Sequence, residues 1–589
     1  MSKFIFAMEC DLRDKAAQIP KSLDLGRIAP MHWPMQKTSH RSPAVTRLRN
    51  VAVMLLACVP CAVTAAAVAP TPTSGRTRAT LDSRLQVEAN DPVTRQFYTQ
   101  NGWMPVWTDA AVQALRQAQS DRARHGLDRV VFMHVLPASA NAAVREVALT
   151  RAALGYAAAL AHGRVDPQAL HQIYTLPRPK VDLAGGLSDA IKAGNLSTWF
   201  AALAPQDDGY AKLSSAYLDF SREARNDNTP DADIAESGVI RVGDTDDRVP
   251  AIIKQLLENE YLVPGQAPLP TSVSDPSAVS GTQAGAKIGE TAELPTGTSP
   301  TALSLSPNLY TQQIADAVKR LQEDYGIAAD GVVGVDALEV LNLHSGDRAR
   351  ALAVALERRR WLPRTPPATR IDVNLAAALM RYYRDGKLVD SRKVIVGKPN
   401  NATPQLLAPI FRLVANPTWT VPKSIERSEL SNVSAAYLRK RNMVRRNGNI
   451  VQLPGANNAL GLVKFDMSNK YAIYLHDTNS RSLFGRSQRH LSHGCVRVND
   501  AEGFAALIAE DSGVAAEWQR AKAGRSRAFV KLPQNLPVRL IYQNVFVNDD
   551  GQVAFRADAY DWNGRISTAL GFPELSSTIA KPGAVDISP

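Results

Sequence analysis

The sequence predicts a multidomain fold with an α-helical domain, a small α-helical module and a β-rich domain. Three observations support this prediction. A length of 589 residues suits about three or four domains. Apolar residues recur at helical spacing up to residue 362, whereas alternating spacing and hairpin turns follow residue 365. The composition, 21% charged and 45% hydrophobic, excludes a wholly disordered chain, a collagen and a polytopic membrane protein. Lys and Arg outnumber Asp and Glu by 68 to 56, which suits an anionic partner.

The N-terminal 69 residues contain an expected export segment. An apolar run over 51–69 follows Arg47 and Arg49 and ends in small residues in an A-x-A pattern, which is typical of a signal peptide. We expect cleavage; an uncleaved anchor or a lipid anchor at Cys58 are the alternatives. Residues 1–50 would form a cytoplasmic extension. The predicted localisation is periplasmic, with membrane association only through this segment.

Loss of residues 1–69 would also remove three of the four cysteines and leave Cys495. Exported proteins usually hold cysteines in disulfide pairs. A single cysteine is therefore either a small buried apolar side chain or a working thiol. Composition leaves both readings open, and the neighbours of Cys495 must decide between them.

Residues 70–245 are expected to form a helical domain. Val144–Leu160 and Leu187–Leu203 carry apolar residues at helical spacing, and the region has no cluster of Cys, His or carboxylates, so we assign it a scaffold role. Residues 264–308 hold seven prolines, four charged residues and no aromatic residue. Such a segment buries too little apolar surface to order itself, and we expect a flexible insert.

A second helical unit is expected over 246–345, interrupted by that insert. Within it, Tyr310–Leu343 has one apolar helical stripe and then a D-G-x-x-G turn at 330–334. It is either a generic helical hairpin or, because Leu321-Gln322 precedes the turn, a module that resembles the peptidoglycan-binding repeat family. Val249–Tyr261 would then be its first helix. The insert departs from the family pattern and weakens any expectation of glycan binding.

A linking helix is expected within 346–364, and a β-rich domain over 365–563 with one main helix near Ala501–Ala509. Residues 564–589 would be a C-terminal tail. The Asp385-Gly386 pair predicts a hairpin turn. Strands are expected at Ile371–Val373, Val394–Gly397, Leu462–Met467, Tyr471–His476, Val538–Val547 and Val553–Tyr560, with a last turn at Asn548-Asp549-Asp550-Gly551.

The chemistry-bearing residues gather around Cys495. A thiol of ordinary pKa is mostly protonated at neutral pH, and a nearby imidazole such as His476 can take its proton. Cys495 follows a glycine, where backbone N–H groups can approach a reacting carbonyl. Arg489, His490 and Arg497 would add positive potential and could receive a substrate carboxylate. These positions supply a nucleophile, a base and an anion clamp.

Two other readings of these residues stay open at this point. A zinc site is one, although no H-x-x-x-H pair on a helix and no paired cysteines support it. A buried structural cysteine with surface histidines is the other, and the crowding of His and Arg around a lone thiol argues against it. The acceptable zinc ligands are His476, Asp477, His490, His493 and Cys495.

The spacing of these residues resembles a known family. Fifteen residues, Asp477–Leu491, separate His476 from Ser492-His493-Gly494-Cys495. That is the signature of the L,D-transpeptidases of the YkuD fold, whose catalytic domain is β-sandwich-like. Other runs match the larger, YcbB-like members with a scaffold domain and a peptidoglycan-binding module. They are Phe97-Tyr98, Pro105-Val106-Trp107, 163–167, 357–363, 396–399, Thr403-Pro404, 416–419, Pro454-Gly455 and Leu460-Gly461.

The resemblance implies a cysteine enzyme that acts on peptidoglycan stems without a cofactor or metal. Cys495 would attack the carbonyl of the third stem residue and expel D-Ala as a thioester forms, with His476 as base. The backbone at Asp477 would fix the tautomer of His476. His493 and Gly494 would shape the oxyanion site, and Arg497 would bind or orient the substrate. Attack by an amine of a second stem would give a 3→3 cross-link.

The resemblance also implies a substrate lid over about 423–460, with Trp419 and Tyr474 lining the cleft; core packing is the alternative for Tyr474. Seven basic residues of this lid form either a flap that attracts carboxylates or a solvated helix face. They are Lys423, Arg427, Arg439, Lys440, Arg441, Arg445 and Arg446, against Glu426 and Glu429.

Other functions remain open from the sequence. Water as acceptor would give an L,D-carboxypeptidase, and a protein lysine would give protein anchoring to the wall. A non-catalytic wall-binding scaffold is a further alternative, which intact His476 and Cys495 disfavour. The expected partners are peptidoglycan stem peptides and cell-wall synthases, with no nucleic acid.

Overall fold

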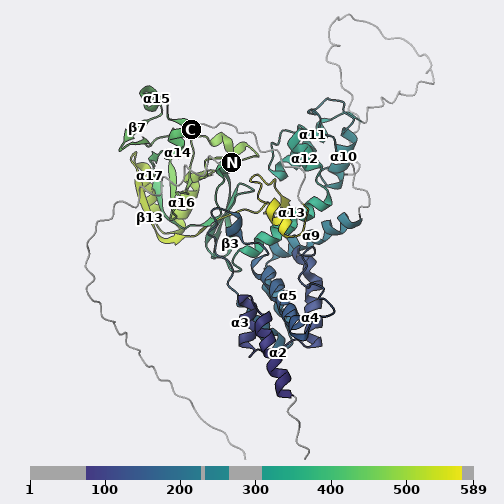
Figure 1. Ribbon diagram of the computed structural model, residues 1–589. Helices are drawn as coiled ribbons and strands as arrows, with labels where there is room; N and C mark the ends of the chain where they lie inside the picture. Colours follow the sequence, from purple (N-terminus) through teal and green to yellow (C-terminus); the bar gives the residue numbers. More distant parts are fainter. Residues whose placement is uncertain (1–73, 227–232, 264–307, 574–589) are drawn as a thin grey trace, which may run out of the picture. The chain divides into compact units, whose positions relative to one another are not determined.

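The computed structural model describes residues 74–226, 233–263 and 308–573 (Figure 1). The expected export segment, residues 264–307 of the insert and residues 574–589 lie outside these ranges. Among the described residues, no helix has the length and apolar character needed to span a membrane.

The N-terminal region is helical, as the sequence predicts. Capping side chains start several helices: Asp91, Thr108 and Asn141 each accept a hydrogen bond from a backbone N–H of the first turn. The apolar spacing of Leu187–Leu203 is divided between two helices, because Gly194 adopts φ +66° and ends the first. The helices are α2 (Ser74–Glu88), α3 (Pro92–Gln100), α4 (Asp109–Ser120), α5 (Ala142–His162), α6 (Pro167–Leu170), α7 (Leu183–Ala193), α8 (Leu196–Leu203) and α9 (Asp208–Asn226).

Three helices on both sides of the insert share one apolar core: α10 (Val249–Glu258), α11 (Gln312–Tyr325) and α12 (Val335–Leu341). The buried side chain of Gln322 holds the following turn, since its Oε1 accepts from Gly331 N at 2.8 Å and its Nε2 donates to Val332 O at 2.9 Å. Gly331 has φ +71° and lies against Ala315, so a side chain there would clash. The two halves of the module therefore fold as one unit.

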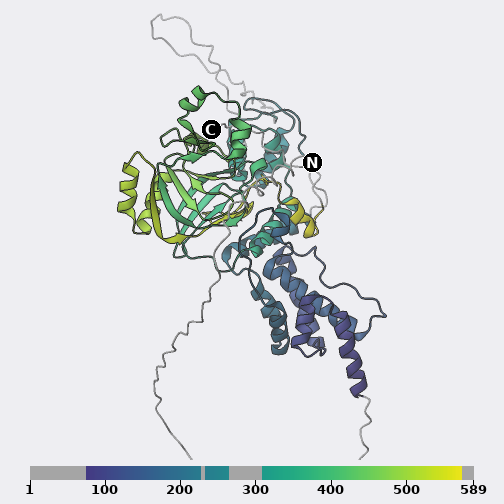
Figure 2. The same ribbon diagram turned by 60° about the vertical axis from the view of Figure 1, so that its left-hand side comes forward.

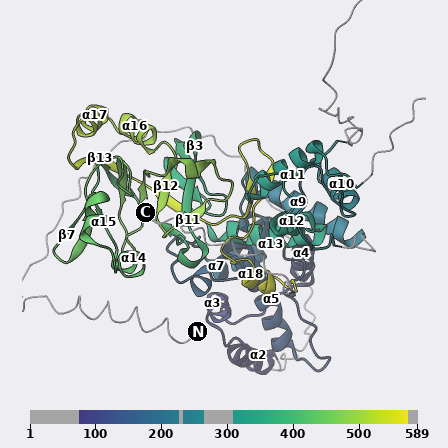
Figure 3. The ribbon, with the colours of Figure 1, turned by 90° about the horizontal axis from the view of Figure 1, so that it is seen from above.

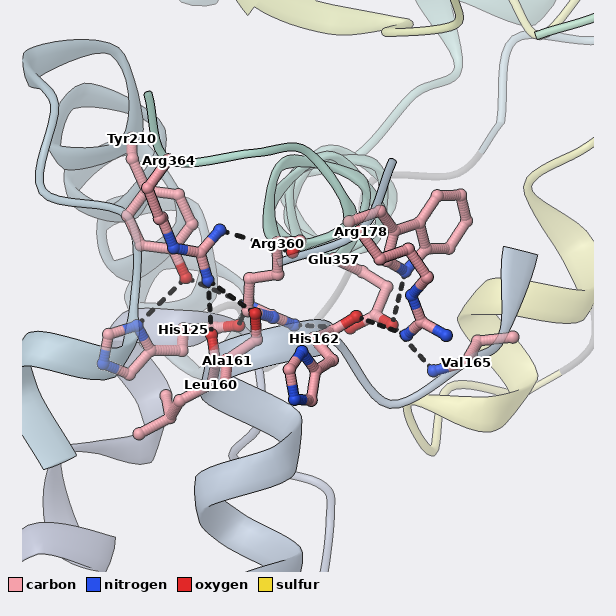
Figure 4. Close-up of polar contacts among 11 residues, drawn as sticks. His125, Leu160, Ala161, His162, Val165, Arg178, Tyr210, Glu357, Arg360 and Arg364 are labelled. Carbon is pink, nitrogen blue, oxygen red and sulfur yellow. Dashed lines mark hydrogen bonds and ion pairs between the residues drawn. The ribbon is translucent and has the colours of Figure 1, made fainter. Parts of the chain in front are cut away.

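Helix α13 (Ser345–Trp361) carries a buried polar network on the face that packs on the scaffold helices (Figure 4). Glu357 and Arg360 form a 2.7 Å ion pair with both side chains fully buried. Glu357 Oε1 also accepts from Val165 N at 2.8 Å, and Arg360 donates to Tyr210 at 2.9 Å. The network gives every buried charge a partner and fixes the helix against the scaffold.

The opposite side of α13 holds the C-terminal part of the chain. Arg358 donates to Asn544 Oδ1 at 2.9 Å, to Asn563 Oδ1 at 2.6 Å and to the carbonyl of Trp562 at 3.1 Å. Its guanidinium also lies 4.9 Å from the ring centre of Tyr542. Neighbouring residues of one helix thus bind two different regions.

The β-rich region forms a curled sheet of eleven strands (Figure 2). Most of its strands follow the order β13-β5-β9-β10-β12-β3-β2-β1-β14-β4, and β11 pairs with β3. Figure 3 labels β3, β11, β12 and β13 of this sheet. The strands are β1 (Arg370–Asn374), β2 (Leu379–Arg384), β3 (Lys387–Gly397), β4 (Leu406–Leu407), β5 (Ile410–Ala415), β9 (Val463–Met467), β10 (Leu475–His476), β11 (His490–Ser492), β12 (Val496–Val498), β13 (Ala528–Leu536) and β14 (Val538–Ile541).

The long strand β3 links the two halves of this sheet, and residues of both halves enclose one apolar core. The Asp385-Gly386 turn between β2 and β3 has both residues at positive φ, 52° and 81°, as the hairpin prediction requires. Two helices, α16 (Ala501–Asp511) and α17 (Ala515–Ala523), pack on the sheet where the sequence predicted one main helix. Only the last two residues of the expected strand Tyr471–His476 pair as strand β10.

The C-terminal boundary expected from the sequence is wrong. The predicted strand Val538–Val547 divides into β14 and β15 (Val545–Val547), and β15 pairs with β16 (Val553–Phe555) in a separate hairpin. Residues 564–573 are not a tail: α18 (Gly564–Ala569) buries Ile566 in the core of the scaffold helices, and Val545 joins the same core. The last segment packs against distant parts of the chain, since α18 contacts α13 and Arg129 covers the ring of Phe572, and local periodicity does not reveal such contacts.

Candidate active site

The backbone around Cys495 is held by a set of short hydrogen bonds. Ser492 Oγ donates to the carbonyl of Cys495 at 2.6 Å and accepts from Gly494 N at 3.1 Å. Thr403 Oγ1 donates to the carbonyl of Gly494 at 2.9 Å. Gly494 has φ +114°, a conformation that residues with a side chain rarely adopt. The Ser-His-Gly-Cys run thus forms a fixed turn that presents Cys495 immediately before β12.

Strand pairing brings Cys495 and His476 to the same face of the sheet. Parallel strands β10 and β12 pair Leu475 with Val496 and His476 with Arg497. Leu475 and Val496 point into the apolar core. Because side chains alternate between faces, Tyr474, His476, Cys495 and Arg497 share the opposite face. Lys464 of β9 pairs with His476 in register and joins them.

The thiol of Cys495 is partly buried and contacts the strand beside it. Its Sγ lies 3.7 Å from the carbonyl oxygen of Ala472, and both the backbone N–H and the hydroxyl of Tyr474 hydrogen-bond to the sulfur. Burial raises the pKa of Cys495, although Tyr474 and the charges of Lys464 and Arg497 act in the opposite direction. The thiol is therefore protonated in the resting protein and needs a base.

His476 has the protonation state that a base requires. Its Nδ1 lies 2.6 Å from the carbonyl oxygen of Asp477, so Nδ1 carries the hydrogen and Nε2 has a free lone pair. Burial, together with the positive charges of Arg497 and Lys464, lowers the pKa of His476 to about 3. The imidazole is neutral at physiological pH. Among the described residues no hydrogen bond joins His476 to Cys495 directly, as is common before substrate binds.

The side chain of Asp477 supports the neighbouring loop. Its Oδ2 accepts from Leu462 N at 2.9 Å and from Arg481 at 3.0 Å. Gly461 packs so closely on this carboxylate that an added Cβ would lie 2.3 Å from Oδ2. Because the carboxylate is engaged in these contacts, the backbone carbonyl of Asp477 is the group that contacts His476.

Arg497 and His493 flank the thiol differently. Burial lowers the pKa of Arg497, and in the described part of the chain its Nε has no hydrogen-bond partner. A buried donor of this kind suits an anionic ligand. His493 Nε2 instead forms a 2.7 Å contact with Glu429 Oε1, and burial is the main cause that lowers the pKa of His493. The Glu429 contact ties the Ser-His-Gly-Cys turn to the lid.

The expectation that Arg489 and His490 add positive potential at the thiol is wrong. Arg489 donates to carbonyl oxygens of Ala377, Ala378 and Val394. His490 Nε2 lies 2.9 Å from the carbonyl oxygen of Leu375, and burial lowers the pKa of His490 to about 4, so its ring is neutral. Both side chains hold the sheet edge around β11.

The region expected to form the lid is a small subdomain with its own apolar core. It contains α14 (Lys423–Glu429), α15 (Ala435–Lys440) and a sheet in the order β6 (Trp419–Thr420), β8 (Asn449–Gln452), β7 (Met443–Arg446). Trp419 is buried in this core, and the Tyr474 hydroxyl hydrogen-bonds to both Trp419 and Cys495. Tyr474 thus combines core packing with a contact to the thiol.

The basic residues of the lid are only partly available as a cationic flap. Lys423 and Arg445 both pair with Glu426, at 2.6 and 3.1 Å, while Arg439 and Lys440 are exposed on α15. The described structure is compatible with both readings of the charge run.

Sequence reasoning missed a row of charges beside the thiol. Lys464 lies 4.1 Å from the ring centre of Tyr474 and 2.8 Å from Asp466, which pairs with Arg412 at 2.5 Å. The sequence contains a signal for this row, because apolar and polar residues alternate in Val463-Lys464-Phe465-Asp466. The polar residues of this run share the sheet face of His476. Glu429 carried no local signal, because only the folded lid brings it to His493. No group of three or more His, Cys, Asp or Glu side chains in the described ranges is arranged to hold a metal ion.

Comparison with known proteins agrees with this arrangement. The model of the L,D-transpeptidase catalytic domain (YkuD) matches residues 368–515, and that of the Scaffold domain matches residues 92–217. A Haemophilus influenzae protein named an L,D-transpeptidase is 29% identical over 227 residues, which cover 34% of this chain. The chain spans about half the length of that curated relative, 45%.

Solved L,D-transpeptidases also match. A variant from Enterococcus faecium is 14% identical, with a TM-score of 0.17, over 31% of this chain and 52% of that one. Another, from Xylanimonas cellulosilytica, is 15% identical, with a TM-score of 0.17, over 52% of this chain and 98% of that one. The family matches, with the fold described above, show that this chain carries an L,D-transpeptidase catalytic domain of the YkuD family, preceded by a Scaffold domain.

Proposed function

We propose that the protein is an L,D-transpeptidase that forms 3→3 peptidoglycan cross-links through a thioester on Cys495. The observation that carries the proposal is the sheet face shared by Cys495, neutral His476 and Arg497, whose Nε has no hydrogen-bond partner among the residues that the structure describes. This face offers a nucleophile, a base and an anion-binding group.

In the first step His476 Nε2 takes the thiol proton as the sulfur attacks the carbonyl of the third stem residue. The C–N bond to the terminal D-Ala then breaks, and His476 returns the proton to the leaving amine. The thioester retains the free energy of the cleaved peptide bond, so no nucleotide is consumed.

Donors for the oxyanion come from this chain's own groups. Gly494 N–H is already bonded to Ser492, so we assign the donors to the N–H of Cys495 and the hydroxyl of Tyr474, with Gly494 and His493 shaping the turn. Arg497 binds a stem carboxylate.

In the second step an amine of another stem attacks the thioester carbonyl and loses its proton to His476. The C–S bond breaks and the thiol re-forms. Water or a protein lysine could replace this amine, giving carboxypeptidase or anchoring activity. The proposed setting is the periplasm, with peptidoglycan stems as substrate and cell-wall synthases as neighbours.

Intact-mass spectrometry tests the proposal. After incubation with a tetrapeptide stem or a carbapenem, wild-type protein is expected to gain the mass of one acyl group, and Cys495→Ala is expected to gain none. The reason is that the described part of the chain has a single free cysteine. Label on both proteins, or on neither, would contradict the mechanism. Wild-type protein that binds sacculi without forming an adduct would favour the non-catalytic scaffold.

The pH dependence of acylation gives a second test. An imidazole with the ordinary pKa of about 6.5 would be about thirtyfold less available as a base at pH 5 than a fully neutral one. With a pKa of about 3, His476 stays neutral at pH 5. We therefore expect the acylation rate to change by less than about threefold from pH 7 to pH 5. Stopped-flow measurement with one carbapenem checks this, and an acid limb centred near pH 6.5 would contradict it.

A further inference from the structure

An open hollow of about 630 Å³ lies on the outer face of the lid sheet. In β6, Trp419 turns inward to Tyr474, so its neighbours Thr418 and Thr420 face the other side and line the hollow. Three arginines line it as well, and the lining contains no Asp or Glu. They are Arg446, Arg525 and Arg527.

The three arginines of the hollow differ in how they are held. Arg446 and Arg525 are exposed, and no ion pair holds either of them within the described residues. Arg527 is positioned by a 3.0 Å hydrogen bond to Thr418 Oγ1. The turn that carries Arg525 and Arg527 is fastened by Asn416, whose Nδ2 donates to Gly524 O at 2.7 Å. Exposed guanidinium groups around a hollow without carboxylates favour a carboxylate-bearing ligand.

A continuous row of contacts leads from this hollow to the thiol. Arg527 lies 5.1 Å from the ring centre of Phe529, a half-exposed residue of β13. Arg412 covers the same ring at 4.3 Å. Strand register places Phe529 on the face of Cys495, and β13 ends the main path of the sheet. From Arg412 the row continues through Asp466 and Lys464 to Tyr474 and Cys495.

We propose that the hollow binds carboxylates of the acceptor stem, the peptide whose amine attacks the thioester. A stem held there can extend over Phe529 and along the charged row, which places its amine on the side of Cys495 that faces β13. The donor stem is held separately, by Arg497. This inference rests on the proposed function and assigns its acceptor to a surface of the lid that lies away from the thiol.

The experiment separates acylation from acceptor attack in the full-length protein. The variants are the double change Arg446→Ala with Arg525→Ala, the charge-conserving double change to Lys, and Arg520→Ala as a matched exposed arginine of α17 outside the hollow. Acylation by a carbapenem reports on the thiol. A tetrapeptide stem at fixed saturating concentration serves as donor. A tripeptide stem, which lacks the terminal D-Ala and so serves only as acceptor, is varied to give the acceptor KM and kcat for the mixed cross-linked product.

We expect the double Ala variant to keep the wild-type acylation rate. Its KM for the acceptor should rise about five- to tenfold. The fraction of thioester that is hydrolysed, and not cross-linked, should increase. Arg520→Ala is expected to stay near wild type, and the double Lys variant, which keeps the charge but loses the guanidinium fork, should lie between wild type and the double Ala variant. Added salt should raise the wild-type KM and remove most of the difference, since the charges are exposed. An acceptor whose carboxylates are amidated should have the same raised KM with wild-type protein and with every variant.

An unchanged acceptor KM in the double Ala variant would overturn the inference. Acylation that slows in this variant by the same factor as cross-linking would overturn it too. Inorganic phosphate that inhibits acceptor binding at concentrations at which acetate has no effect would also overturn the inference, because it would indicate a phosphate site. If wild-type protein forms no acyl adduct, the proposed function itself fails; an intact adduct with an unaffected KM rejects only the acceptor site.

Discussion

Replacing His476 by Ala is expected to slow acylation of Cys495 by about 10²–10⁴-fold, the range that a positioned general base supplies. The resting thiol is protonated because burial raises the pKa of Cys495, and His476 is the neutral imidazole on its sheet face. Measured carbapenem acylation rates at pH 7 give the comparison. His344→Ala changes a histidine of the helical module and should leave the rate unchanged.

The pH dependence of the variant distinguishes loss of a base from loss of structure. As pH rises, Cys495 deprotonates without help, so the difference between His476→Ala and wild type should narrow toward pH 10. A constant deficit at all pH values would indicate that His476 only supports packing. A deficit below about fivefold at pH 7 would contradict the assignment of His476 as base.

Glu357→Gln is expected to lower the free energy of unfolding by about 3–5 kcal/mol, because it leaves Arg360 as a buried charge without its partner. Both side chains of the pair are 0% exposed, and Glu357 also accepts from Val165 and Trp361 (Figure 4). Urea denaturation followed by the helical circular-dichroism signal measures the change.

The neighbouring residue offers a matched control. Arg359 pairs with Asp207 on the same helix, but its side chain is 31% exposed and that of Asp207 is 52% exposed. Arg359→Gln should therefore cost less than about 1 kcal/mol. Equal losses for the two variants would show that the buried network contributes no more than a surface pair.

The sequence alone predicts what depends on local chemistry. The Asp385-Gly386 turn and the helices α5 and α11 follow from turn residues and apolar spacing. The family motif led to the expectation that His476 and Cys495 act together, and the adjacent strands β10 and β12 bring both residues to one face of the sheet. Contacts between distant segments are different, because no local pattern records them. Glu429 at His493, the turning of Arg489 toward β3 and the burial of Ile566 among scaffold helices all depend on which surfaces meet.

The two-sided attachment of α13 has a consequence for recombination between relatives. Arg358 binds the chain at 544–563, and Glu357 and Arg360 bind the scaffold. A chimera that transplants only residues 368–515 would keep all of these partners together, whereas one that exchanges the chain from residue 365 onward would set the recipient's Arg358 against a foreign segment 544–563. Natural recombination should therefore exchange the helix, the β15–β16 hairpin and α18 together, so that these three segments share one ancestry.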